Sequence, residues 1–171
     1  MIDIAKQAIR FIVLVIIQAL VLNQLEIGFS IQFMVTPIFL MLLPFETSTI
    51  LMMVLGFVMG IMIDSISNTY GLHASSLVFL AFIRPFLFKR FEPREGYDVL
   101  KTPSIYDMGT GWFISVFGLF LFFHHLWFFT LEIFKFDETI FILRKSLVSL
   151  PFSFLIALLL QALFVSTSKN K

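Results

Sequence analysis

The chain has 171 residues, of which 59% are hydrophobic and 13% charged, and its formal net charge at pH 7 is +1. Soluble domains carry about a quarter charged residues, and a soluble fold of this length could not bury so much apolar surface, so a mean hydropathy of +0.99 indicates an integral membrane protein. The near-zero net charge excludes a general nucleic-acid-binding footprint, and the lack of cysteine excludes disulfides, thiolate metal sites and cysteine nucleophiles.

Six apolar segments predict an all-α membrane protein with six transmembrane helices in a single domain. They cover residues 8–25, 33–45, 50–66, 72–88, 108–131 and 147–165. A spanning helix needs about 20 apolar residues, with a range of about 17 to 25, so the second segment is too short by this measure. It also contains Pro37 and Pro44, which makes a re-entrant or kinked element a serious alternative there.

The distribution of basic residues favours a full crossing by the second segment. If six segments cross and the chain starts in the cytoplasm, nine of the twelve Lys and Arg residues lie inside and three lie outside, namely Lys135, Arg144 and Lys145. If the second segment did not cross, the basic loop at 89–101 would be outside, against the positive-inside rule. We therefore expect six spans in contact with membrane lipids, with both termini in the cytoplasm.

Gly56, Gly60 and Asp64 follow one another at four-residue steps in the third segment. Such steps keep all three near one face of a helix, and small residues let membrane helices approach closely. The two glycines therefore predict a helix contact within the chain. Asp64 has two interpretations. It either reaches headgroup water or caps a helix end beside the polar residues 67–69, or it is a buried anchor that fixes the third segment against the fourth.

The other polar groups in the apolar segments have structural explanations. His73 opens the fourth segment as an interfacial hydrogen-bond donor, and Arg84, beside Pro85, is expected to snorkel to the cytoplasmic boundary. His124 and His125 are adjacent, so they point in different directions and have no carboxylate partner at ligand spacing. We therefore expect no metal and no cofactor. Motifs for nucleophilic or phosphate chemistry are also missing, so an enzyme is the weakest class.

The longest connection between segments is the loop at residues 89–108, which carries mixed charges, Pro and Gly. Connections of about 20 residues are uncommon and usually have a function. We therefore expect a cytoplasmic contact surface in this region. The basic side chains predicted to contact a partner are Arg84, Lys89, Arg90 and Arg94.

Residues 56–83, GFVMGIMIDSISNTYGLHASSLVFLAFI, resemble the central signature of the rod shape-determining protein MreD family. In that family a glycine-rich third helix ends in an Asp that is followed by a Gly, and the corresponding positions here are Gly56, Gly60, Asp64 and Gly71. Pro37 is similar to the proline that leads the second helix of the family. The close match covers 28 of the 171 residues. The rest agrees in length and layout, whereas the long loop at 89–108 departs from the shorter connection expected.

The resemblance implies a non-enzymatic scaffold in the bacterial cytoplasmic membrane that serves cell elongation and lateral peptidoglycan synthesis. The partners it implies are the bitopic protein MreC, the actin-like MreB filament, and the elongation glycan polymerase and transpeptidase. The implied fold is similar to that of the substrate-binding components of energy-coupling-factor transporters. That similarity leaves a second function open, the substrate-binding membrane subunit of a vitamin transporter, although the A-x-x-x-A docking patch of such subunits is absent from the first segment.

Overall fold

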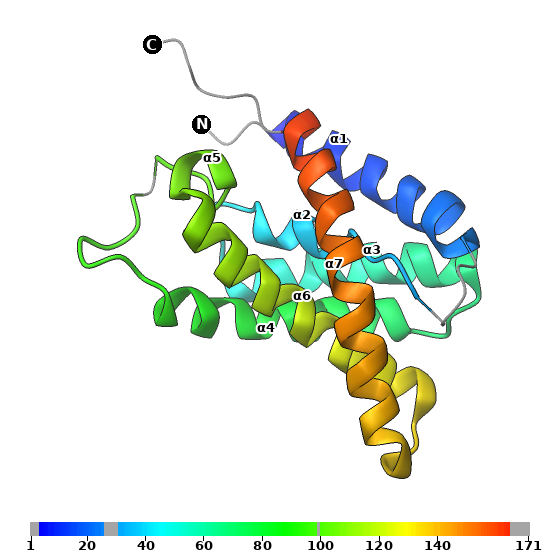
Figure 1. Cartoon of the computed structure of the whole chain (residues 1–171). Helices are drawn as coiled ribbons and strands as arrows, with labels where there is room; N and C mark the ends of the chain where they lie inside the picture. Colours follow the sequence, from blue (N-terminus) through cyan, green and yellow to red (C-terminus); the bar gives the residue numbers. More distant parts are fainter. Residues whose placement is uncertain (1–3, 26–30, 99, 165–171) are drawn as a thin grey trace.

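The computed structural model describes residues 4–25, 31–98 and 100–164, and it is all-helical (Figure 1). Its α-helices are α1 (Ile4–Ile16), α2 (Pro37–Met41), α3 (Thr49–Ser67), α4 (Leu72–Arg90), α5 (Ile105–Met108), α6 (Thr110–Ile133) and α7 (Thr139–Phe164), and a π-helical turn (Ile17–Val21) and a short 3₁₀ turn (Leu22–Gln24) extend α1. A second 3₁₀ turn (Phe136–Glu138) precedes α7.

Five helical segments of the described chain are long and apolar enough to cross a membrane. They are Ile4–Gln24, Thr49–Ser67, Leu72–Arg90, Thr110–Ile133 and Thr139–Ala162. Their length and composition indicate a multi-pass membrane protein. They correspond to five of the six predicted segments.

The ends of these helices differ from the predicted ends by a few residues, and α7 differs most. It begins at Thr139, eight residues before the predicted start at Leu147. Arg144 and Lys145 therefore belong to the helix and not to a loop. Lys145 pairs with Glu132 of α6 at 2.6 Å, so its charge is balanced inside the helix pair. The predicted last residue of this segment, Val165, lies outside the described residues.

The prediction of a helix over residues 33–45 is wrong, because only α2 is helical there. Pro37 occupies the first turn of α2, where its fixed φ suits a helix start and its missing N–H leaves no bond unmade. The helix ends at Met41, before Pro44. Five residues rise only about 7.5 Å, so α2 alone cannot cross a membrane.

Residues 31–45 nevertheless run from one end of the helix bundle to the other (Figure 1). Asn23 donates to the Ser67 hydroxyl at 2.8 Å, which brings the end of the α1 region to the C-terminal end of α3. Residues 31–45 start at this end and finish where Arg84, near the end of α4, contacts the carbonyl of Pro44. Since α3 and α4 are antiparallel, the stretch passes along their whole length.

The Gln18 side chain satisfies one side of the non-helical backbone before α2. Its amide oxygen accepts the Val35 N–H at 2.8 Å, and its amide nitrogen donates to the Phe33 carbonyl at 2.8 Å. A residue of an adjacent parallel strand would make the same pair of bonds. Gln18 lies in the π-helical turn and is fully buried, so a single side chain replaces a neighbouring strand.

Two serines of α7 satisfy the other side of this backbone. Ser149 and Ser153 lie one turn apart on the same face of the helix, and their hydroxyls accept the N–H groups of Gln32 at 3.2 Å and Met34 at 2.9 Å. His125 donates through Nδ1 to a carbonyl of its own helix, so its Nε2 accepts the proton of the Ser153 hydroxyl at 3.0 Å. The Ser153 hydroxyl therefore joins the non-helical stretch to α6.

We predict that Ser153→Ala lowers the free energy of unfolding by about 2 kcal/mol, because it leaves the Met34 N–H and His125 Nε2 buried without a partner. The matched control is Ser115→Ala, since the exposed Ser115 hydroxyl bonds only to the Gly111 carbonyl of its own helix. This change should stay within about 0.5 kcal/mol. Unfolding of both variants in mild detergent provides the comparison. Equal losses would mean that α7 does not support the non-helical stretch.

Candidate functional site

The turn between α3 and α4 contains three residues with positive φ, namely Asn68, Tyr70 and Gly71, and the last of them has the largest φ. Asn68 ends α3 with φ of 55°, and Gly71 precedes α4 with φ of 90°. A left-handed backbone costs an ordinary L residue about 1–2 kcal/mol, but costs glycine very little. A Cβ at Gly71 would meet no atom within 4 Å, so the preference for glycine there comes from the backbone and not from packing. As the N-terminal flanking residue of α4, however, Gly71 has no side chain that could cap the helix.

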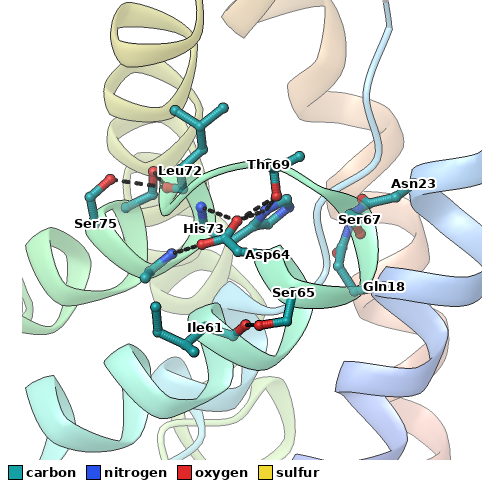
Figure 2. A network of polar contacts seen from close by, with 12 residues as sticks. Gln18, Asn23, Ile61, Asp64, Ser65, Ser67, Thr69, Leu72, His73 and Ser75 are labelled. Carbon is teal, nitrogen blue, oxygen red and sulfur yellow. Dashed lines mark hydrogen bonds and ion pairs between the residues drawn. The ribbon is translucent and has the colours of Figure 1, made fainter.

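Asp64 supplies the missing cap from the preceding helix (Figure 2). Its carboxylate accepts the backbone N–H groups of His73 at 3.1 Å and Ala74 at 3.0 Å, both in the first turn of α4. It also accepts the Thr69 hydroxyl and, at 3.0 Å, Nδ1 of His73. The first N–H groups of a helix lack intrahelical partners and carry partial positive charge, which a carboxylate stabilises. Asp64 is only 5% exposed, so it does not reach headgroup water. It caps a helix end, and it is also a buried anchor between α3 and α4.

Gly56 and Gly60 lie on the face of α3 that packs against α4, and the contact at Gly60 is the tighter one. A Cβ at Gly60 would lie 2.7 Å from the carbonyl carbon of His73 and closer still to the backbone of Ala74. A Cβ at Gly56 would lie 3.1 Å from the carbonyl oxygen of Leu77. The backbones of α3 and α4 therefore touch beside Gly60, next to the residues that Asp64 caps.

We predict that Gly60→Ala lowers the free energy of unfolding by about 2–3 kcal/mol, because backbone atoms must move to admit the methyl group. For Gly56→Ala we expect less than about 1 kcal/mol, since the better helix propensity of alanine offsets part of the crowding. Gly118→Ala is the matched control, because a Cβ there meets no atom within 4 Å. Of the three variants, Gly60→Ala should have the lowest melting temperature in detergent. A Gly60→Ala protein as stable as Gly118→Ala would contradict the close contact.

The predictions that Arg84 snorkels and contacts a partner are wrong. Arg84 is 2% exposed, and its guanidinium donates to the carbonyls of Leu43, Met41 and Pro44. These carbonyls lie where α2 ends, and a helix end leaves its last carbonyls without intrahelical partners. The guanidinium also lies 4.3 Å from the centre of the Phe88 ring. The sequence signal was the pair Pro37 and Pro44 in a short apolar segment, because a helix that ends between them leaves carbonyls that need a donor.

The remaining basic residues of the predicted contact surface, Lys89, Arg90 and Arg94, are exposed at the end of α4 and in the loop that follows. Two aromatic side chains fix this loop to the bundle. The Tyr97 hydroxyl donates to the Phe88 carbonyl at 2.7 Å, and Trp112 Nε1 donates to the Phe91 carbonyl at 2.9 Å. Burial raises the pKa of Tyr97, so the phenol stays protonated and able to donate. The basic side chains are thus presented on an anchored loop, and their contact with a partner stays a prediction.

A cleft of about 690 Å³ lies at the opposite end of the bundle, where the α1 region, α3 and α6 end. Polar residues of the wall come from several elements that lie far apart in the sequence. They include Asn23, Gln24, Gln32, Ser67, Thr69, His73, Glu132 and Lys145. The only sequence signal was that polar residues stand at the ends of successive apolar segments. Such a signal cannot show that the α1 region, the non-helical stretch, α3, α4, α6 and α7 converge.

His73 joins the cleft to the Asp64 cap. The sequence predicted an interfacial donor, but His73 is 2% exposed and its Nε2 has no hydrogen-bond partner in the described part of the chain. The neighbouring Phe128 ring lies 4.9 Å away, centre to centre. Within the same described residues, no three metal-ligating side chains gather into a site that could hold an ion. The cleft therefore offers hydrogen bonding, and its wall contains the ion pair between Glu132 and Lys145.

Comparison of the chain with protein-family models, with curated proteins and with solved structures found no match.

Proposed function

We propose that this chain is a non-enzymatic membrane scaffold of the bacterial cell-elongation machinery, as its resemblance to the MreD family implies. One observation supports the proposal most. The residues that carry the resemblance, Gly56, Gly60, Asp64 and Gly71, all serve the junction of α3 and α4. The hydrogen bonds of Asp64 are made within that junction. A carboxylate used in this way stabilises a rigid frame and is not held ready for proton or group transfer.

The proposal includes six passes through the cytoplasmic membrane with both termini inside. Residues 31–45 supply the sixth pass, because they return the chain along α3 and α4 with their backbone buried in protein, where a non-helical crossing is tolerated. Basic residues support the orientation. The end of the bundle that holds the start of α1 and the end of α4 carries Lys6, Arg10, Lys89, Arg90, Arg94 and Lys101, whereas the other end carries Lys135, Arg144 and Lys145.

We predict that a cysteine at Glu92 is labelled by a membrane-impermeant thiol reagent only after the cells are opened, whereas one at Asp137 is labelled in intact cells. The native chain contains no cysteine, so each introduced thiol reports alone. Both positions lie between long helices at opposite ends of the bundle. The reverse pattern, in which Glu92 is labelled in intact cells and Asp137 only after the cells are opened, would contradict a crossing by residues 31–45 from a cytoplasmic start.

We predict that depletion of the protein gives rounded, widened cells and that Asp64→Asn restores rod shape at least partly. The amide oxygen of Asn can replace Oδ1, but its NH₂ group would face the Ala74 N–H. The expected loss is about 1–2 kcal/mol. Asp64→Leu leaves all the donors of the cap without an acceptor, should cost more than about 3 kcal/mol, and should fail to restore shape because less protein accumulates. Microscopy with immunoblots of each variant provides the measurement.

The implied partners are tested in the same cells. Purification of the tagged chain in mild detergent should recover MreC, MreB and the elongation glycan polymerase and transpeptidase. If Asp64→Asn abolished rod shape while the protein level stayed normal, the negative charge itself would be needed. A proton- or ion-coupled role would then replace the scaffold.

The second candidate function is the substrate-binding membrane subunit of a vitamin transporter, and the cleft favours it. Its volume falls within the range of about 300–1,000 Å³ that small-molecule sites occupy. Purification and depletion together separate the two functions. A transporter subunit would co-purify with ATPase components, and its depletion would leave cell shape unchanged.

A further inference from the structure

We propose that the cleft at the outer end of the bundle binds an uncharged, hydroxyl-bearing group of sugar-like chemistry, and that His73 Nε2 accepts a hydroxyl proton from it. This inference goes beyond the scaffold function and does not depend on it. It is drawn from the cleft, from the unused acceptor of a residue that lines it, and from the balance of charge on its walls.

The acceptor is defined by the partner on the other side of the imidazole ring. An ionised Asp64 carboxylate can only accept, so the Nδ1 atom that contacts it at 3.0 Å carries the proton of the ring. In the neutral ring, Nε2 then has a free lone pair. His73 lines the cleft, is 2% exposed and has no partner for Nε2 in the described part of the chain. A buried acceptor without a donor is costly, so a ligand that brings a hydroxyl or an N–H gains a bond that the free protein lacks.

The walls of the cleft favour a ligand without net charge. Lys145 Nζ lies 2.6 Å from Glu132, whose second oxygen accepts the Gln32 amide at 2.8 Å. The two charges neutralise each other, so the described residues that line the cleft present no unmatched charge to an anion or a cation. Ligand hydroxyls can still share the carboxylate, which has more acceptor positions than these two donors use.

The other polar groups of the cleft are amides and hydroxyls, which both donate and accept. Gln24 and Gln32 supply amides, Ser67 and Thr69 supply hydroxyls, and Phe128 supplies an apolar ring beside His73. A polyhydroxylated ring has matching chemistry, because its hydroxyls donate and accept around its edge while its C–H groups pack on an aromatic side chain. The volume of about 690 Å³ accommodates a sugar with room for water.

Two sources could present this chemistry: a free sugar or polyol from the aqueous side, and the headgroup of a neutral glycolipid. The cleft lies where the spanning helices end, so both can reach it. The test therefore uses both. The full chain is purified in a zwitterionic, sugar-free detergent and incubated with radiolabelled glucose in equilibrium dialysis. In parallel it is reconstituted with monoglucosyl diacylglycerol, and bound lipid is counted by native mass spectrometry against diacylglycerol.

The diagnostic variant is His73→Asn. Its amide nitrogen can still donate to Asp64 in place of Nδ1, but it has no atom at the position of Nε2. We expect saturable binding to the native chain and a Kd raised about tenfold in His73→Asn, which corresponds to one lost hydrogen bond. Ser75→Ala is the matched control in the same turn of α4, because this hydroxyl bonds to the Leu72 carbonyl and does not line the cleft. Its Kd should be unchanged.

Each outcome is informative. Saturable binding of glucose identifies a free sugar as the ligand, and retention of the glycolipid over diacylglycerol identifies a headgroup. Binding that His73→Asn leaves intact, in a protein that melts like Ser75→Ala, overturns the assigned acceptor. Absence of saturable binding by either probe overturns the site. Neither failure changes the expectation for cell shape, so the scaffold function is judged separately.

Discussion

The structure depends on one constraint: backbone N–H and C=O groups that lie at membrane depth must find partners within the protein. Five long helices meet this constraint by themselves, but the stretch from residue 31 to residue 45 does not. Gln18 on one side and Ser149 and Ser153 on the other supply the bonds that a sheet would have supplied. Polar residues in the apolar helices are therefore part of the crossing itself.

Helix ends pose the same problem, and the two most buried charges of the α3–α4 pair answer it. Asp64 near the end of α3 accepts the first N–H groups of α4, while Arg84 near the end of α4 donates to the last carbonyls of α2. The negative Asp64 faces the positive N-terminal end of α4. The positive Arg84 faces carbonyl groups at the end of α2, which have no partner within that helix. Gly60 brings the backbones close enough for the first of these contacts. Charge, glycine spacing and turn conformation thus act together at one junction.

The sequence was sufficient where a feature depends on neighbours along the chain. Long apolar runs predicted the five spanning helices, and the four-residue spacing of Gly56, Gly60 and Asp64 placed them on one face. It was insufficient where distant segments supply the partner. A prolyl residue in a short apolar run does not tell whether Gln18 and two serines will support an extended backbone. Likewise, Arg84 near a helix end has the same sequence pattern whether it snorkels to water or turns inward to α2. The cleft forms where six separate parts of the chain converge, which no local pattern records.

The polar groups of the apolar helices fall into two classes, and the difference bears on function. Asp64, Gln18 and Ser153 use their hydrogen-bonding atoms within the fold, so they explain how the chain is held together and offer little to a ligand. Among the described residues, His73 has one unpartnered ring nitrogen and His124 has two. His124 is fully buried and does not line the cleft, so an unused atom alone does not define a site. His73 differs because its unused atom belongs to a residue of the cleft wall, while its other nitrogen is fixed by the cap on α4. A ligand at this nitrogen would therefore contact the residue whose other nitrogen and backbone N–H are held by Asp64.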